Sequence, residues 1–424
     1  MTPDDLYYQL ADNNIFLSGG AGVGKSYLTT KIIELFKQEG KSVIPLGSTG
    51  ISAVNIGGYT LHSFFVFGIA STLEELRLQD RKNSSRLSEL KKVLQNLDLI
   101  IIDEISMVSA DLMDMIYYRL EQLGFNGRLL VVGDFYQLPP VVKEQKSNGL
   151  FEYSYYAFDS SAWSRFHFKP IILEEIKRTK DREFAKILSS IRKGEVTSEV
   201  RSYLHTLLRN YFQSELDPTY LFGRNLEAEL MNKEKLSMID ANEALYFWQK
   251  KKIGSVDDKR IESWLKALPI VESLHLKVGA PVIFTVNKWG KFVNGQRGVV
   301  VELEPDYIII ESEGREITLY RHDFELTKIN PETLESEVVA YVEQFPIKLA
   351  YAITIHRSQG MSLASMVCNV DRLFVPGQFY VAISRAIDPK SLRIEYNRGE
   401  SFDTYLDSVI VKNRRVDSFY KELV

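Results

Sequence analysis

The stretch GGAGVGKS, residues 19–26, decides the fold of this chain. It follows a short apolar run, residues 14–18 (NIFLS), and precedes residues 25–36, where apolar side chains recur at helical spacing. A strand, a glycine-rich loop and a helix in this order predict a P-loop, whose backbone N–H groups and helix N-terminus hold phosphates. The alternative is a glycine-rich turn without function, but a chance match has a probability of only about 1–2%. The residues expected to hold the nucleotide are Gly19, Gly20, Ala21, Gly22, Val23, Gly24, Lys25 and Ser26.

Two acidic residues follow a second buried strand. Residues 97–102 (LDLIII) read as that strand, and Asp103 and Glu104 come directly after it. Open α/β sheets bind their ligands at the carboxyl ends of the strands, so we expect both acids beside the P-loop, on a neighbouring strand. Asp103 would share Mg²⁺ with the Ser26 hydroxyl, while Lys25 would contact the β- and γ-phosphates. Glu104 is the candidate base that orients the attacking water.

A third strand ends at the same predicted edge. Residues 128–133 (RLLVVG) lead to Asp134 and Gln137, which the sheet would bring to the nucleotide. Gln137 is a candidate sensor of the γ-phosphate. A glutamine that caps the turn before Pro139 is the alternative.

Composition limits the function classes. The chain has 424 residues, enough for two to three domains, and its 45% hydrophobic and 25% charged content is ordinary for globular proteins. A net charge of -4 excludes a positive field over the whole molecule, so anion recognition must be local. Cys368 is the only cysteine, which excludes an internal disulfide and a cysteine metal cluster. The acidic N-terminus and the lack of a long apolar run predict an intracellular, cytoplasmic protein without a membrane span.

Several segments suit nucleic acid, each with a structural alternative. Residues 57–65 (GGYTLHSFF) crowd hydroxyls and aromatic rings that could bind a single strand, although His62 and Phe64, taken alone, are better interpreted as core or capping residues. Residues 72–92 are charged and helical in pattern, which is typical of a solvated face. Residues 287–297 interleave basic and aromatic residues, which fits both a single-strand contact and a packed hairpin tip.

A second α/β lobe begins near residue 169, where strands alternate with helices again. Residues 274–328 interrupt it with short β-rich runs. A phosphoryl-transfer site needs positive charge at the transferred group, and Arg178 and Arg385 are the candidates. Either could instead form an ordinary surface ion pair.

Seven motifs in this order resemble the petite-integration-frequency (Pif) helicases of superfamily one. Besides the P-loop, they are STGISA (48–53), TLHSFF (60–65), IDE (102–104), VGDFYQLPP (132–140), TIHRSQGM (354–361) and YVAISR (380–385). The resemblance extends from about residue 14 to about residue 396. It implies an α/β fold with two RecA-like lobes, a small wedge insert and an SH3-like β insert. The implied boundaries are 1–165 for lobe one with a wedge at about 66–92, 166–240 and 341–424 for lobe two, and 241–340 for the β insert.

The resemblance also implies an ATP- and Mg²⁺-dependent helicase that moves 5′ to 3′ on single-stranded DNA and unwinds duplex, forked or G-quadruplex DNA. We expect it to act as a monomer. Lys25, Ser26, Asp103, Glu104 and Gln137 would serve the nucleotide from lobe one, and Arg178, Gly360 and Arg385 from lobe two. The segments that contact DNA in the family contain Thr49, Gly50, His62, Ser63, Phe64, Thr354, His356 and Ser358.

The chain departs from the family pattern at a few positions. Gln9 lies closer to Lys25 than the usual adenine-reading glutamine, and the glycine-rich signature of eukaryotic members is missing from residues 109–128. The position of Gln9 leaves adenine specificity open, and the missing signature favours a bacterial or phage-like branch. A second hypothesis is a DNA-stimulated ATPase subunit that remodels or recruits without unwinding.

Overall fold

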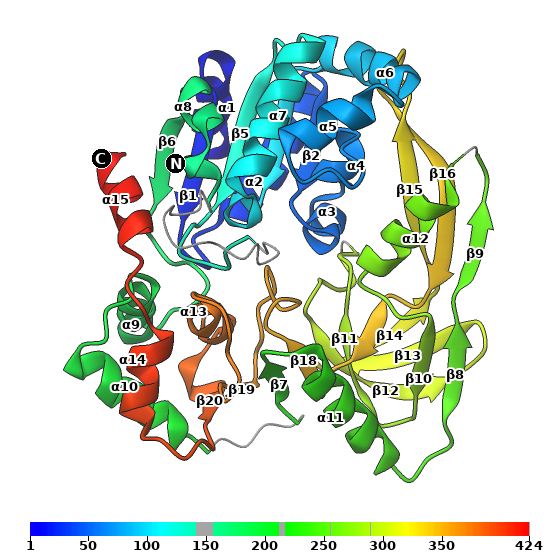
Figure 1. Ribbon diagram of the computed structural model, residues 1–424. Coiled ribbons are helices and arrows are strands. Elements are labelled where there is room, and N and C mark those ends of the chain that lie inside the picture. The colour runs from blue at the N-terminus through cyan, green and yellow to red at the C-terminus, as the bar shows by residue number, and fades with distance from the viewer. Residues whose placement is uncertain (141–155, 212–216, 255, 289, 424) are drawn as a thin grey trace. The chain divides into compact units, whose positions relative to one another are not determined.

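The computed structural model describes residues 1–140, 156–211, 217–254, 256–288 and 290–423 (Figure 1). The chain forms two compact units. The first contains residues 1–177, 328–337 and 413–424, and the second contains residues 178–327 and 338–412. No helix in the described ranges is long and apolar enough to cross a membrane.

The first unit is built on a six-stranded parallel sheet with the strand order β3-β2-β4-β5-β1-β6. Its inner strands are buried along nearly their whole length, as parallel strands covered on both faces must be. The strands are β1 Ile15–Gly19, β2 Val43–Gly47, β3 Tyr59–Thr60, β4 Leu99–Asp103, β5 Arg128–Gly133 and β6 Lys169–Leu173.

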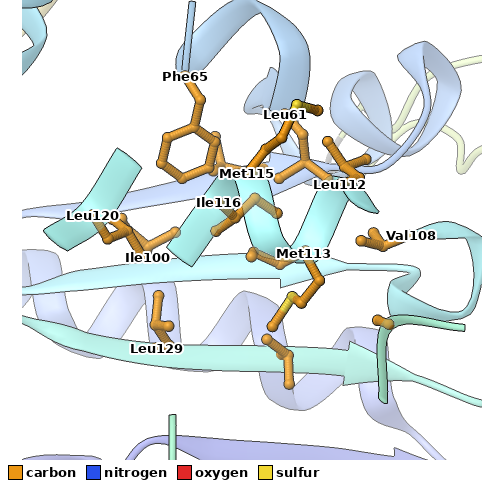
Figure 2. Packing of buried hydrophobic residues seen from close by; sticks show 14 of the residues in the cluster. Leu61, Phe65, Ile100, Val108, Leu112, Met113, Met115, Ile116, Leu120 and Leu129 are labelled. Atoms are coloured by element: carbon orange, nitrogen blue, oxygen red, sulfur yellow. The ribbon is translucent and has the colours of Figure 1, made fainter. Parts of the chain in front are cut away.

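Helices cover both faces of this sheet. One apolar core joins α1 and α2 to alternate strand residues such as Ile15 and Leu17. The other joins α6, α7 and α15 to the strand residues between them, such as Phe16; Figure 2 shows Ile116 and Leu120 of α7 close to Ile100 of β4. The helices are α1 Pro3–Asp12, α2 Lys25–Gln38, α3 Gly50–Ile56, α4 Leu61–Phe64, α5 Leu73–Asp80, α6 Ser84–Gln95, α7 Ala110–Leu123, α8 Ser161–Arg165 and α15 Arg414–Glu422.

The second unit has a four-stranded parallel sheet with the order β18-β7-β19-β20. The strands are β7 Thr219–Phe222, β18 Ala352–Thr354, β19 Met366–Asn369 and β20 Leu392–Glu395. The helices of this unit are α9 Arg182–Arg192, α10 Ser198–Leu208, α11 Asn225–Ser237, α12 Asp258–Ala267, α13 Gln378–Ile383 and α14 Phe402–Val409.

A β-rich insert with its own apolar core interrupts the second unit. A five-stranded antiparallel sheet, ordered β14-β13-β12-β11-β17, is its main part, with smaller sheets β10-β8 and β15-β16-β9 beside it. The strands are β8 Ala244–Phe247, β9 Gln249–Lys252, β10 Ser273–Leu276, β11 Pro281–Phe284, β12 Arg297–Leu303, β13 Tyr307–Ser312, β14 Arg315–Tyr320, β15 His322–Ile329, β16 Ser336–Gln344 and β17 Ile347–Leu349. The α/β fold class is confirmed, whereas the SH3-like comparison stays a prediction.

The structure corrects three of the expected boundaries. Strand β6 pairs with β1, so lobe one continues beyond residue 165. Helix α15 buries Val416 and Phe419 in the core of the first unit, so the second lobe does not include the end of the chain. Strand β17 pairs with β11 in the insert, which therefore extends past residue 340. All three errors have the same cause: the segment that each element pairs with or packs against lies far away in the sequence.

The segment expected as a wedge, residues 66–92, forms α5 and most of α6, and a buried ion pair fixes it. Arg119 of α7 is fully buried and donates to both carboxylate oxygens of Asp80 at 2.8 Å. Its Nε also donates to the Phe65 carbonyl at 3.0 Å. Glu74, Glu75 and Arg77 of α5 are exposed, as expected, whereas Asp80 is held by Arg119 and Leu76 joins the core.

We expect Asp80→Ala to destabilise the first unit by about 3–5 kcal/mol, because the charge of Arg119 would stay buried without its carboxylate. Urea denaturation measures the change. Glu74→Ala, at an exposed position on the same helix, is the control and should change stability by less than about 1 kcal/mol. The double variant Asp80→Ala/Arg119→Met should recover part of the loss; equal stability of Asp80→Ala and the wild type would contradict the prediction.

Candidate nucleotide and nucleic-acid site

The predicted P-loop lies between β1 and α2. Gly24 precedes the helix with φ 98°, a left-handed backbone conformation that favours glycine. A Cβ on Gly19 would lie 2.4 Å from the Leu173 carbonyl oxygen of β6, so this position accepts no side chain. The ammonium group of Lys25 donates to the carbonyls of Gly19 and Gly20 at 2.7 and 2.9 Å. The loop is therefore folded around the cation that would contact the phosphates.

The acidic pair lies at the carboxyl end of β4, as predicted, but β5 separates β4 from the P-loop strand. The expectation of a neighbouring strand is thus wrong, since sequence order does not give strand order. Burial raises the pKa of Asp103, while the Glu104 N–H, which donates to it at 2.9 Å, and the charge of Lys25 oppose this rise. Glu104 has φ 54° and ψ 49°, and such non-glycine strain is frequent at functional sites.

The strand between them, β5, carries the expected sensor. Gln137 is nearly buried, and its side-chain amide donates to Asp134 Oδ2 at 3.2 Å. The Gln137 backbone N–H donates to the Asp134 carbonyl at 2.9 Å. The glutamine is thus part of a turn, as the alternative proposed, and the same contacts hold its amide at the edge of the sheet.

Ser26 and Asp103 fit a magnesium ion chemically. Mg²⁺ prefers oxygen ligands and keeps several of its waters, and a hydroxyl with a carboxylate meets that preference. A cation beside Asp103 would also offset the burial that raises the pKa of this carboxyl. Among the described residues no group of three or more His, Cys, Asp or Glu side chains could hold a metal, so nucleotide and water would supply the other ligands.

The two candidate arginines come together within the second unit. Arg178 Nη1 donates to the Ser384 carbonyl at 2.7 Å, and Arg385 Nη2 donates to the Ser384 hydroxyl at 2.9 Å. Arg385 is almost fully buried, and its Nη1 approaches the Ser358 carbonyl at 3.5 Å. Burial, together with the positive charge of Arg385, lowers the pKa of Arg178 to about 9. An anion such as a phosphate would relieve this repulsion, whereas a solvated surface ion pair would not produce it.

Comparison with known proteins identifies the family. A model described as PIF1-like helicase matches residues 5–202. The ATP-dependent DNA helicase Pif1 of Campylobacter jejuni is 43% identical over 433 residues, which cover 99% of this chain and 97% of that protein. The chain belongs to the PIF1-like helicases. The Pif1 helicase of Bdellovibrio bacteriovorus is 37% identical over 395 residues, and the match covers 90% of this chain and 84% of that protein.

A solved structure of a PIF1-like helicase also matches along the chain. The crystal structure of a Bacteroides Pif1 in complex with ADP-AlF4 has a TM-score of 0.83 and 29% identity, and the match covers 99% of this chain and 96% of that one. The family resemblance inferred from the motifs and the α/β fold of this helicase are thereby confirmed.

The DNA segment expected in the first unit of this PIF1-like helicase divides between surface and core. Thr49 caps α3, which begins at Gly50, and its hydroxyl is bonded to Ser52. His62 and Ser63 are exposed on α4. Phe64 is 5% exposed and packs edge-on against Phe65 in the core. Direct contact of Phe64 with DNA is not supported in this conformation, because α4 turns Leu61 and Phe64 inward on one face.

The corresponding residues of the second unit are mostly internal. Thr354 and Ser358 are buried, and the Ser358 hydroxyl donates to the Ile355 carbonyl at 2.7 Å. Their direct contact with DNA is not supported in this conformation, because these hydroxyls shape the turn that leads to Gly360, where φ is 80°. His356 is half-buried and stacks on Phe374, with 6.0 Å between ring centroids. Phe374 is 56% exposed and was missed by the sequence analysis, since an isolated phenylalanine before Pro376 carries no pattern.

The basic and aromatic loop at residues 287–297 is largely a packed hairpin tip. Phe292 is buried and stacks on Phe284 at 4.2 Å. Arg297 is bonded to the Asp217 carbonyl, and burial lowers its pKa to about 10. Lys288 and Lys291 remain exposed, while Trp289 lies outside the described residues.

Proposed function

We propose that this PIF1-like helicase couples ATP hydrolysis to 5′ to 3′ movement along single-stranded DNA and separates the strands of duplex and forked DNA. The observation that carries the proposal is the set of groups at the carboxyl edge of the first sheet. A P-loop lysine, a buried acidic pair and a fixed glutamine lie at the ends of β1, β4 and β5. These groups match what the first lobe must supply for hydrolysis of a nucleoside triphosphate: a cation for the phosphates, a metal ligand and a group that orients water.

Each residue has a defined role in the proposed reaction. Lys25 leaves the loop carbonyls and neutralises the β- and γ-phosphates. Ser26 and Asp103 would hold Mg²⁺, which would supply positive charge to the phosphates. Glu104 orients the attacking water, and Gln137 senses the γ-phosphate. Arg178 and Arg385 of the second unit bring positive charge to the same phosphate during the cycle.

Hydrolysis can move the protein only if ATP binds one conformation of the two units more tightly than another. The turn from Thr354 to Gly360 is suited to report this difference, since Arg385 Nη1 lies 3.5 Å from the carbonyl of Ser358, two residues after His356. We propose that His62, Ser63 and His356 contact the DNA strand. His62 and Ser63 are exposed, and His356 is half-buried, as are Thr49 and Gly50, whose contact with DNA stays a prediction.

The DNA partners in this proposal are those with which similar helicases have been studied. One similar solved structure is a Bacteroides Pif1 bound to single-stranded DNA. Another is described as the structural basis for DNA unwinding at forked double-stranded DNA by two coordinating Pif1 helicases. Activity on G-quadruplex DNA and action as a monomer stay predictions for this chain.

Strand separation on tailed duplexes tests the function. With ATP and Mg²⁺, we expect unwinding of a duplex with a 5′ single-stranded tail and none of one with a 3′ tail. Unwinding only from the 3′ tail would contradict the proposed polarity. If DNA stimulates ATP hydrolysis but neither substrate is unwound, the protein remodels or recruits without unwinding.

A further inference from the structure

The C-terminal helix α15 contacts two segments of the candidate site in the first unit: strand β1, which leads into the P-loop, and the loop after β5 that carries Gln137, here called the sensor loop. After residue 177 the chain returns to this unit at residues 328–337 and again at residue 413, so α15 joins the sheet from the far end of the sequence. Its apolar face is anchored by Val416, which is fully buried, and by Phe419. The Phe419 ring stacks on Phe158 with 4.2 Å between centroids and meets Phe135 edge-on at 5.4 Å.

Polar contacts fix the start of this helix. Asn413 donates to the Tyr156 hydroxyl at 2.6 Å, and Arg415 donates to Asp159 at 2.8 Å. The position of α15 on the first unit is therefore set before its last turn begins.

The hydroxyl of Tyr420, in that last turn, joins the P-loop strand to the sensor loop. It lies 2.6 Å from the Ser18 hydroxyl, and it accepts a hydrogen bond from the Phe135 N–H at 3.3 Å. Ser18 directly precedes Gly19 of the P-loop, and Phe135 lies two residues before Gln137. One side-chain oxygen therefore links the two segments that would hold the phosphates and sense them.

The ring of Tyr420 holds the residue next to the sensor. Tyr136 stacks on it with 5.1 Å between centroids and 7° between the planes, and the Tyr136 hydroxyl donates to Asp417 Oδ1 at 2.7 Å. Tyr136 directly precedes Gln137, whose amide donates to Asp134. Helix α15 thus contacts the sensor loop through Phe135 and Tyr136.

We propose that Tyr420 is a positioning residue for ATP hydrolysis, which sets the distance between the P-loop strand and the loop that carries Gln137. The proposal rests on the proposed function of that site. Packing alone does not require the hydroxyl, because the rings of Phe419 and Tyr420 would fill the same space without it. The hydroxyl is the group that contacts both the P-loop strand and the sensor loop.

The test is Tyr420→Phe, which keeps the ring stack and removes the shared oxygen. We expect the kcat of DNA-stimulated ATP hydrolysis to fall about three- to tenfold, the usual effect of one hydrogen bond. The KM for ATP and the affinity for a single-stranded oligonucleotide should change less than about twofold. Tyr8→Phe on α1, where the side chain is 73% exposed, is the matched control and should leave all three unchanged.

A second background separates positioning from a general effect on structure. If Tyr420 acts through the sensor, Tyr420→Phe should change the hydrolysis rate less than about twofold when Gln137 is already alanine. Rates are measured with enzyme in excess over ATP, so that a slow variant still gives a slope. An equal reduction in both backgrounds, or an unchanged kcat in Tyr420→Phe alone, would overturn the proposal.

Amide hydrogen exchange gives an independent measurement where Gln137→Ala is too slow to assay. The Phe135 N–H loses its acceptor in Tyr420→Phe, so its exchange should become faster, while exchange in α2 should stay as in the wild type. Unchanged exchange at Phe135 would overturn the proposal. A wild-type protein without DNA-stimulated ATP hydrolysis would instead refute the proposed function, and the exchange result would still report on the contact.

Discussion

Lys25→Ala is expected to lower DNA-stimulated ATP hydrolysis by about 10²–10³-fold or more while single-stranded DNA binding stays within about threefold of the wild type. The reason is local. The ammonium group of Lys25 lies 2.7 and 2.9 Å from two carbonyls of the P-loop, and no backbone N–H can supply its positive charge to the phosphates. Hydrolysis is measured with and without an oligonucleotide, and binding by fluorescence anisotropy.

Lys31→Ala is the matched control for this prediction. Lys31 lies on the same helix, α2, and forms a surface ion pair with Glu34. Lys31→Ala therefore also removes a lysine side chain from α2, but one that does not contact the P-loop. We expect hydrolysis in Lys31→Ala within about twofold of the wild type, since surface ion pairs contribute little. Hydrolysis in Lys25→Ala at the level of this control would refute the assignment of the P-loop.

Local patterns predicted the parts of the site that one segment builds by itself. A strand, a glycine-rich loop and a helix are adjacent in the sequence, so Gly24 and Lys25 could be placed from their neighbours alone. The same holds for Asp103, which follows a run of buried residues. In these cases the physical cause, backbone conformation or burial, acts within about ten residues.

The parts that could not be predicted depend on contacts between distant segments. In the sheet, β5 lies between β4 and β1, so β4 is two strands away from the P-loop strand. The order of the strands in the sequence does not reveal this arrangement. Tyr420 meets Ser18 across 402 positions of the chain, and no periodicity marks such a pair. Phe64 was expected to contact DNA because the motif that contains it contacts DNA in the family. On the short helix α4, however, Phe64 follows Leu61 by three residues and therefore lies on the same buried face as Leu61.

Arg385→Ala is expected to reduce ATP hydrolysis by about 10³–10⁵-fold, the range reported for arginines that stabilise a transferred phosphoryl group. Arg385 is buried within the second unit, where its Nε donates to the Val381 carbonyl at 2.9 Å and its Nη2 to the Ser384 hydroxyl. The guanidinium is thus held in one orientation before any nucleotide binds, so little ordering is needed when the phosphate arrives. Single-stranded DNA binding should stay within about threefold.

Arg385→Lys should not restore the activity, because an ammonium group cannot donate from three nitrogens in one plane and so cannot keep this orientation. Loss of folding is the competing explanation for low activity in either variant, and thermal unfolding checks it. Arg372→Ala is the control, since Arg372 is an exposed arginine of the same unit, paired with Glu227. We expect this control to hydrolyse ATP as the wild type does. If Arg385→Lys folds and retains hydrolysis within about tenfold of the wild type, the oriented guanidinium is not the source of the catalytic charge, and Arg178 becomes the arginine to test.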